Sequence, residues 1–189
     1  MTVDQRALVE RAKGGDHDAF IALIDLSLAR LDAAAWLILR DAELARDAVQ
    51  DAMVRAWRDL PGLRDPDRFG PWLHRLTVNS CLDQARQRSR RRIEVELTPV
   101  VHPAVADTTA LVADRDMLDR ALTRLDPEQR AVVVLRFFLD LSLPETAAAL
   151  GIPVGTVKSR LHRSLERMRI SVTSDVVGSP TANAEGGLA

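Results

Sequence analysis

The chain has 189 residues, a formal net charge of −1, and a composition that is 47% hydrophobic and only 4% aromatic. These residues suffice for a core, while the single cysteine, Cys81, excludes an intrachain disulfide and hence a disulfide-stapled secreted fold. No segment approaches the ~20 apolar residues of a membrane span, and the first residues lack the apolar core of a signal peptide, so a cytoplasmic location is expected. Because Ala, Leu and Arg dominate and Tyr is absent, we predict an all-α fold.

The first half of the chain shows the three- and four-residue hydrophobic spacing of amphipathic helices. Gly14-Gly15 and Pro61-Gly62 interrupt this pattern, because glycine and proline disfavour a continuing helix. We interpret the helices as one domain, residues 1–92. The predicted helices span residues 4–12, residues 16–40 with a bend near 31–35, the stretch from 42 to 60, and residues 69 to 92.

Helical periodicity stops at residue 93 and returns at about residue 114. The segment between, 93–113, contains Pro99 and Pro103, and we predict that it is a flexible linker. Residues 114–170 then form a second small helical domain of four helices. Beyond it, residues 171–189 are rich in Gly, Ser, Ala and Thr, which predicts a disordered tail.

The second domain contains the pattern of a helix-turn-helix. Ser142 and Glu145 have the spacing of a capping box, Gly151 suits the left-handed residue that ends a helix, and Pro153 suits the first turn of the next one. The second helix has an apolar stripe on one side and a cationic, hydrogen-bonding face on the other, which is typical of a helix that enters the major groove of DNA. That outer face comprises Thr156, Lys158, Ser159, Arg160, His162, Arg163 and Arg167.

The charges are unevenly distributed, although they nearly cancel. Residues 84–92 hold five arginines and no acid, residues 154–169 are also strongly basic, and the intervening 93–113 carries only acidic charges. Two basic patches on either side of an acidic spacer favour a nucleic-acid partner in spite of the net charge.

Other classes of function receive less support. The four histidines are scattered, and no HExxH, CxxC or GxSxG pattern occurs, so neither an enzyme nor a metal or cofactor site is expected. Gly151, Gly155, Lys158 and Ser159 echo a phosphate-binding loop, but their spacing is wrong and no strand precedes them. A helix-turn-helix repressor or a response-regulator output domain remains the main alternative, although the first half shows none of the strands of a receiver domain.

Three linked stretches resemble one family, the extracytoplasmic-function (ECF) sigma factors of bacterial RNA polymerase. They are DAVQDAMVRAWRDL (47–60), FGPWLHRLTVNSCLDQAR (69–86), and LDPEQRAVVVLRF (125–137) followed by LGIPVGTVKSRLHR (150–163). The resemblance covers roughly residues 4–169. It departs from the family pattern at Met53, where an aromatic residue is frequent, and in the tail.

The resemblance implies a division of labour between the domains. The first domain would bind core RNA polymerase (the β and β′ subunits) and melt the minus-ten promoter element, and the second would bind the minus-35 element. An anti-sigma factor is a further partner that the family suggests, and no cofactor is implied.

The resemblance also implies a role for particular residues. Asn79 falls where a base flipped out of the non-template strand is captured, while Trp72, Leu73 and Leu76 form the core behind that pocket. The polymerase clamp would contact Asp47, Gln50, Asp51 and Arg58. Phosphates near the melted region would contact Arg86, Arg88, Arg90, Arg91 and Arg92. The minus-35 element would be met mainly by Lys158, Ser159, His162 and Arg163, with Thr156 and Arg160 on the same outer face.

Overall fold

The computed structural model describes residues 4–94 and 110–177, with side chains placed for residues 4–91 and 117–170. Every element in these ranges is a helix, which confirms the predicted all-α fold. The predictions of a flexible linker and a disordered tail concern, for the most part, residues 95–109 and 178–189, which lie outside the described ranges.

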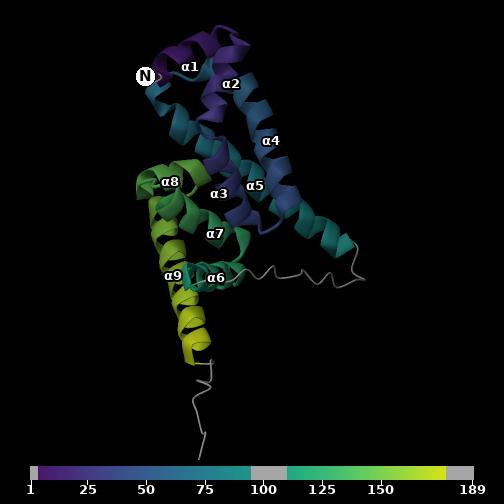
Figure 1. Ribbon diagram of the computed structural model, residues 1–189, viewed down its shortest axis with the longest axis vertical. Coiled ribbons are helices and arrows are strands. Elements are labelled where there is room, and N and C mark those ends of the chain that lie inside the picture. The colour runs from purple at the N-terminus through teal and green to yellow at the C-terminus, as the bar shows by residue number, and fades with distance from the viewer. Residues whose placement is uncertain (1–3, 95–109, 178–189) are drawn as a thin grey trace, which may run out of the picture.

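The first domain is a bundle built around two long helices, α4 and α5, that pack along each other (Figure 1). A core of Phe20, Leu23, Leu31 and Phe69 closes its upper end, where α1 and α2 cover it. Asp4, Asp16 and Asp41 cap three of its helices by accepting hydrogen bonds from backbone N–H groups. Its elements are α1 (Gln5–Lys13), α2 (His17–Asp25), α3 (Leu28–Leu39), α4 (Ala42–Asp59), the short turns η1 (Leu60–Gly62) and η2 (Pro66–Arg68), and α5 (Phe69–Glu94).

The single helix predicted over residues 16–40 is wrong. The chain breaks at Leu26 and Ser27, not near 31–35, and residues 31–35 lie inside α3. The Ser27 carbonyl accepts hydrogen bonds from the N–H groups of Arg30 and Leu31, so a new helix begins there. The break lets α2 pack on α1 while α3 packs on α4 and α5, and tertiary contacts of this kind are invisible to hydrophobic periodicity.

The second domain contains the helix-turn-helix. The predicted capping box is present, with the Ser142 hydroxyl accepting from the N–H of Glu145 at 3.3 Å. A second capping box begins α7, where the Asp126 carboxylate accepts from the N–H of Gln129 at 2.8 Å. Gly151 has φ of 64°, the left-handed conformation predicted for it. The elements are α6 (Ala110–Thr123), α7 (Pro127–Val133), η3, a π-helical turn (Val134–Phe138), α8 (Leu143–Leu150) and α9 (Val154–Val177).

Two predicted boundaries need correction. The linker is shorter than 93–113, because α5 continues to Glu94 and α6 already begins at Ala110. The tail begins later than residue 171, because α9 continues to Val177. Residues 156–177 contain neither Gly nor Pro, so the first helix-breaking signal after the turn is Gly178, followed by Pro180.

The two domains pack against each other and share one hydrophobic core. We call this contact, in which α3 and α5 of the first domain meet α7, η3 and α8 of the second, the interdomain seam (Figure 1). Cys81 is fully buried in it, and burial raises the pKa of its thiol to about 12. The core of the seam includes Ala34, Ala35, Ile38, Val78 and Leu82 from the first domain and Ala131, Val134, Leu135, Leu141 and Ala149 from the second.

Candidate polymerase and nucleic-acid interfaces

Helix α4 has an apolar back and a polar front. Ala45, Ala48, Val49, Ala52 and Ala56 are buried against the bundle. On the opposite side, Asp47, Gln50 and Arg58 are exposed, as predicted, and the apolar Val54 between them is 62% exposed. The helix therefore presents a mixed polar and apolar face on a firmly packed support.

Asp51, the fourth residue predicted on this face, has a second role within the bundle. Its carboxylate accepts a 2.9 Å hydrogen bond from the Ser80 hydroxyl on α5 and forms a 2.8 Å ion pair with Arg55. Ser80 is fully buried, so Asp51 supplies the partner that this hydroxyl requires. Asp51 thus fixes α4 on α5, and a substitution there changes both the surface and the bundle.

Arg58 pairs with its neighbour Asp59, whose carboxylate accepts from the guanidinium at 2.8 and 3.2 Å. This hydrogen bond holds the pKa of Asp59 below its usual range and raises the pKa of Arg58. Next to it, Trp57 packs edge-on against His17 and Phe20 of α2. The C-terminal end of the α4 front is therefore well ordered.

Helix α5 places Asn79 between two positions that are anchored. Thr77 and Ser80 are buried, and their hydroxyls donate to the Leu73 carbonyl and to Asp51. Asn79 is half-buried, and among the described residues no side chain or backbone group hydrogen-bonds its carboxamide. Leu73 is fully buried, while Trp72 and Leu76 pack partly buried on the same core, as predicted. The carboxamide therefore keeps its donors and acceptor available on a rigid helix.

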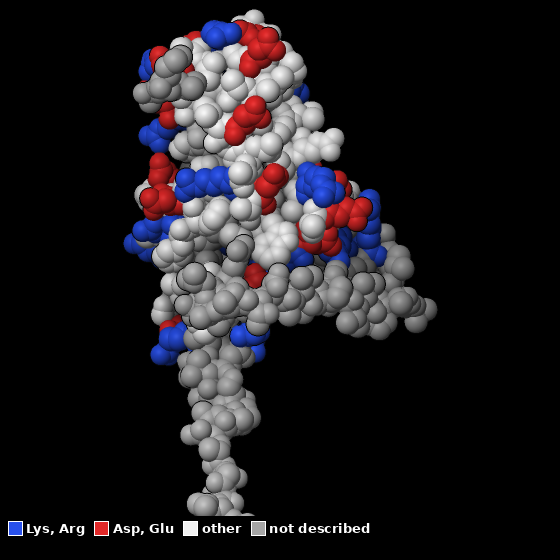
Figure 2. Space-filling model, viewed as in Figure 1, with Lys and Arg blue, Asp and Glu red and all other residues white. Residues whose placement is uncertain are grey.

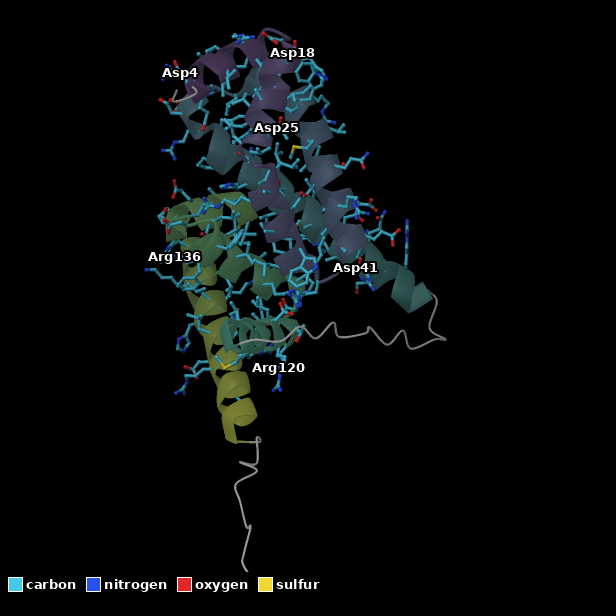
Figure 3. All side chains as sticks on the ribbon, in the orientation of Figure 1. Asp4, Asp18, Asp25, Asp41, Arg120 and Arg136 are labelled. Atoms are coloured by element: carbon cyan, nitrogen blue, oxygen red, sulfur yellow. The ribbon has the colours of Figure 1, made fainter. Side chains whose placement is uncertain are left out.

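The arginines at the end of α5 differ in their surroundings. Arg88 donates to Asp41 at 2.6 Å (Asp41 is labelled in Figure 3). Burial opposes ionisation of Asp41, but the Leu44 N–H and Arg88 outweigh it and keep its pKa low. Arg86 lies 3.4 Å from Asp83 and 3.8 Å from Glu128 of the second domain. Arg90 and Arg91 are exposed, as phosphate contacts require, whereas the side chain of Arg92 lies outside the described residues.

In the second domain, α8 and Gly151 position α9, the predicted recognition helix. Val157 and Ser164 are fully buried on its inner side, and the Ser164 hydroxyl donates to the Arg160 carbonyl. On the outer side, four of the predicted residues are exposed together, and we call this surface the recognition face. It comprises Lys158, Ser159, His162 and Arg163.

The other two predicted residues of this helix lie at the edge of that face. Arg160 is half-buried and forms a 3.0 Å ion pair with Glu128 of α7, and Thr156 is half-buried with its carbonyl accepting from Ser159. Arg167, at the far end, donates to Gln129 at 2.9 Å. The outer surface expected from the sequence therefore divides into an open recognition face and a rim tied to α7.

Sequence reasoning missed two arginines that join the domains. Arg130 is buried and donates to the Ile38 carbonyl of α3 and to the Leu122 and Leu125 carbonyls, and burial lowers its pKa to about 10. Arg40 pairs with Asp119 of α6 and stacks on Trp36, 3.8 Å from the ring centroid. One sequence signal could have indicated this contact, because Arg130 is a charged residue at the start of an apolar run.

The viewed face of the molecule intermixes acidic and basic side chains rather than forming one large patch of a single sign (Figure 2). No helix in the described ranges is long and apolar enough to cross a membrane, and no cluster of potential metal ligands occurs in those ranges. The second domain contains a capped helix-turn-helix with a basic recognition helix, and the all-helical first domain carries an arginine-rich helix. Together these features define a bipartite DNA-binding protein of the transcription machinery.

Comparison with known proteins names that class more closely. Residues 23–91 match the family model for Sigma-70 region 2, and residues 115–168 match that for Sigma-70, region 4. The chain belongs to the ECF family of RNA polymerase sigma factors. It is 42% identical to the ECF sigma factor SigM of Mycobacterium tuberculosis over 82% of this chain and 77% of SigM. It is 28% identical to SigW of Bacillus subtilis, over 85% and 92% of the two chains.

Two solved structures are similar to the whole fold. CnrH in complex with the cytosolic domain of CnrY has a TM-score of 0.64 and 31% identity, covering 90% of this chain and 98% of CnrH. RpoE of Bartonella quintana, in complex with the anti-sigma factor NepR, has a TM-score of 0.66 and 26% identity, covering 82% and 98%. Because both sigma regions are present, a helix-turn-helix regulator that acts without polymerase is not favoured, and the chain directs core polymerase to promoter DNA.

Proposed function

We propose that the two domains divide promoter recognition as the family resemblance implies. The first domain binds the polymerase clamp through α4 and holds the melted minus-ten element on α5, and the second domain reads the minus-35 element with α9. The observation that carries this assignment is the recognition face of α9, four exposed polar residues on a helix whose other side is buried.

At the clamp contact, Asp47, Gln50 and Arg58 supply the polar groups and Val54 supplies apolar area. A surface of this kind buries Val54 from water while the charged groups around it set the orientation of the partner. Asp51 acts mainly behind the surface, because its carboxylate already holds Ser80 and Arg55.

At the minus-ten element, Asn79 hydrogen-bonds the edge of a flipped base, since its carboxamide both donates and accepts. Arg86, Arg88, Arg90 and Arg91 extend from there along α5 and contact phosphates. Arg88 and Arg86 exchange their carboxylate partners for phosphates when DNA binds, so their contribution is smaller than that of an unpaired arginine.

At the minus-35 element, Arg163 contacts a guanine, because its planar guanidinium can donate to both major-groove acceptors of that base. Its Nε atom donates to the Ser159 carbonyl, which orients the side chain along the helix. Lys158 contacts a phosphate, and Ser159 and His162 lie between them on the same face. Thr156 and Arg160 support this surface from its rim.

The chain performs no chemistry itself, since the polymerase supplies the active site. It works in the cytoplasm, where polymerase and promoter DNA meet. An anti-sigma factor is a further partner: the similar structures of CnrH and RpoE were solved in complexes with CnrY and the anti-sigma factor NepR.

A run-off transcription assay tests this proposal. Core polymerase is incubated with a randomised promoter library, with and without the purified chain, and the transcribed templates are sequenced. We expect transcripts from a selected pair of elements only when the chain is present. The double variant Asp47→Ala and Gln50→Ala, which changes two exposed residues, should lose this activity while melting at the same temperature as the parent chain. Initiation that does not depend on the added chain would refute the proposal.

A further inference from the structure

The inner side of the recognition helix α9 is small and largely apolar. Val157 is fully buried, and Leu161 packs half-buried against the same hydrophobic cluster. One turn further along, the inner residue is Ser164, whose hydroxyl donates to the Arg160 carbonyl and is therefore satisfied within α9 itself. Because apolar contacts are not directional, they resist removal of α9 from the domain more strongly than a small rotation of α9 about its own axis.

Two directional links join α9 to the first turn of α7, which packs beside it (Figure 1). Arg160 forms a 3.0 Å ion pair with Glu128, and Arg167 donates a 2.9 Å hydrogen bond to Gln129. Arg160 and Arg167 are seven residues apart, so they lie on the same side of α9, about two turns from each other. Links at two heights on one side of a helix oppose its rotation, so the first turn of α7 is suited to set the orientation of α9.

The link at Gln129 is better protected from water than the link at Glu128. Gln129 is buried, whereas Glu128 is half-buried and also lies 3.8 Å from Arg86, so solvent screens its charge and two arginines share it. The Gln129 carboxamide oxygen accepts from the Arg167 guanidinium and, at 3.3 Å, from the N–H of Asp126. A hydrogen bond from a charged donor is also stronger than one between neutral groups. Gln129 therefore connects the N-cap of α7 directly to α9.

Arg167 lies one turn of α9 beyond Arg163, the residue proposed to contact a guanine. A bidentate contact of this kind requires the guanidinium to be held within about 0.5 Å and 10–20° of its working geometry. Arg163 donates from Nε to the Ser159 carbonyl at 3.2 Å, so its guanidinium moves with the helix. A rotation of α9 would therefore displace Arg163 from the base, whereas a flexible lysine such as Lys158 would still reach a phosphate.

We infer that Gln129 is a positioning residue for reading the minus-35 element: by holding Arg167 it fixes the rotation of α9 and so aims Arg163 at its base pair. Gln129 is buried and acts without contacting DNA. Its effect is on discrimination between bases, and the overall affinity for DNA depends on the exposed cations of α9. This inference rests on the proposed function of α9 and Arg163.

Four single variants, each assembled with core polymerase, test this role. Gln129→Met keeps the length of the side chain but removes the acceptor, Gln129→Glu keeps an acceptor for Arg167, and Arg167→Met removes the donor. The matched control is Arg169→Met, which removes the same charge from α9 where the 3.3 Å ion pair is with Glu166 of the same helix. Binding is measured on a promoter, on its single-base variants in the minus-35 element, and on non-specific duplex at several salt concentrations.

We expect Gln129→Met and Arg167→Met each to reduce the preference at the base pair read by Arg163 at least threefold. Because the two side chains form one link, the variant with both changes should be no worse than either single variant. Gln129→Glu and Arg169→Met should keep the preference. The affinity of both Gln129 variants for non-specific duplex should change less than twofold, and its salt dependence should not change.

Two results would overturn the inference. An unchanged preference in Gln129→Met and Arg167→Met would show that the link does not aim Arg163. An equal loss on every sequence, or a loss of preference in Gln129→Glu as large as in Gln129→Met, would show that Gln129 only stabilises the domain. Arg167 is exposed, so Arg167→Met keeps the test decisive if Gln129→Met does not fold. If Arg163→Ala left every base preference of the parent chain unchanged, the proposed function of Arg163 would itself fail.

Discussion

The two surfaces proposed to contact DNA, on α9 and on α5, have different surroundings. The recognition face of α9 is exposed, with Lys158, Ser159, His162 and Arg163 all accessible. On α5, by contrast, Asn79 is half-buried between the anchored Thr77 and Ser80, and Arg86 lies 3.8 Å from Glu128 of the second domain. The recognition face can therefore be reached from solvent, whereas part of the α5 surface borders the second domain.

The comparison separates roles that one exposed helix can perform from roles that depend on how the two domains pack. The front of α4, with Asp47 and Gln50, is exposed like the recognition face. Substitutions in these two regions should therefore have different consequences.

The largest effect is expected at Arg130, which links the second domain to α3 at the seam. Arg130→Met leaves the Ile38 and Leu125 carbonyls without their donor, and each buried unsatisfied group costs on the order of 1–3 kcal/mol. Because removing a buried charge recovers part of this, we expect a net loss of about 2–3 kcal/mol in the free energy of unfolding, measured by urea denaturation. Arg6→Met, at an exposed site, should change it by less than about 0.5 kcal/mol. An equal effect of both changes would contradict the structural role of Arg130.

The next largest effect is expected at Arg163 on the recognition face. Arg163→Ala should cost about 1–3 kcal/mol of binding at one base pair of the minus-35 element and relax the preference there, as measured by holoenzyme binding to a set of single-base promoter variants. Lys158→Ala is the matched control and should weaken every sequence alike. If Arg163→Ala also weakened all sequences equally, Arg163 would contact phosphate only.

A smaller, pH-dependent effect is expected at His74 of α5, which is half-buried. Burial, with a contribution from the Arg30 charge, lowers the pKa of His74 to about 4. Between pH 6.5 and 4 the unfolded chain therefore binds a proton that the folded chain does not, so stability falls as the pH falls through this window. Allowing for its partial exposure, we expect a loss of about 1–2 kcal/mol, which His74→Gln should abolish. The same slope in both proteins would show that another group is responsible.

The smallest effect is expected at Glu128, which contacts both α5 and α9. Glu128→Gln removes the carboxylate that Arg86 and Arg160 share, and leaves both available for phosphate. The free chain should then bind duplex DNA a few-fold more tightly at low salt, and the dependence of log K on log salt should steepen by about 1 to 2. Glu10→Gln, an exposed acid on α1, is the control. An unchanged salt dependence would show that Glu128 does not compete with phosphate.

The helix-turn-helix could be predicted because its signals are local. The capping box of Ser142 and Glu145 and the left-handed Gly151 each act within a few residues, and the structure has them in the predicted conformation. The open recognition face follows from the same local periodicity.

The seam could not be predicted, because its contacts join distant parts of the chain. Arg130 and the Ile38 carbonyl are 92 residues apart. Arg160 was expected on the outer face, and only the position of Glu128 on α7 shows that it is tied to the rim. The break at Ser27 likewise depends on which helices α2 and α3 pack against. Roles that depend on a single helix could thus be inferred from the sequence, and roles that depend on docking could not.

The reading of two promoter elements by the two domains is the central claim, and one distance tests it most directly, because the elements lie farther apart than the packed domains. Donor and acceptor dyes are attached to Arg64→Cys in the first domain, beside Leu63 of a cavity at the seam, and to Ala148→Cys, which lines that cavity from the second domain. Energy transfer is measured in the free chain and in the complete promoter complex with core polymerase. We predict efficient transfer in the free chain and its loss in the promoter complex. Equally efficient transfer in both states would show that the domains bind the promoter while packed at the seam, and would contradict this account.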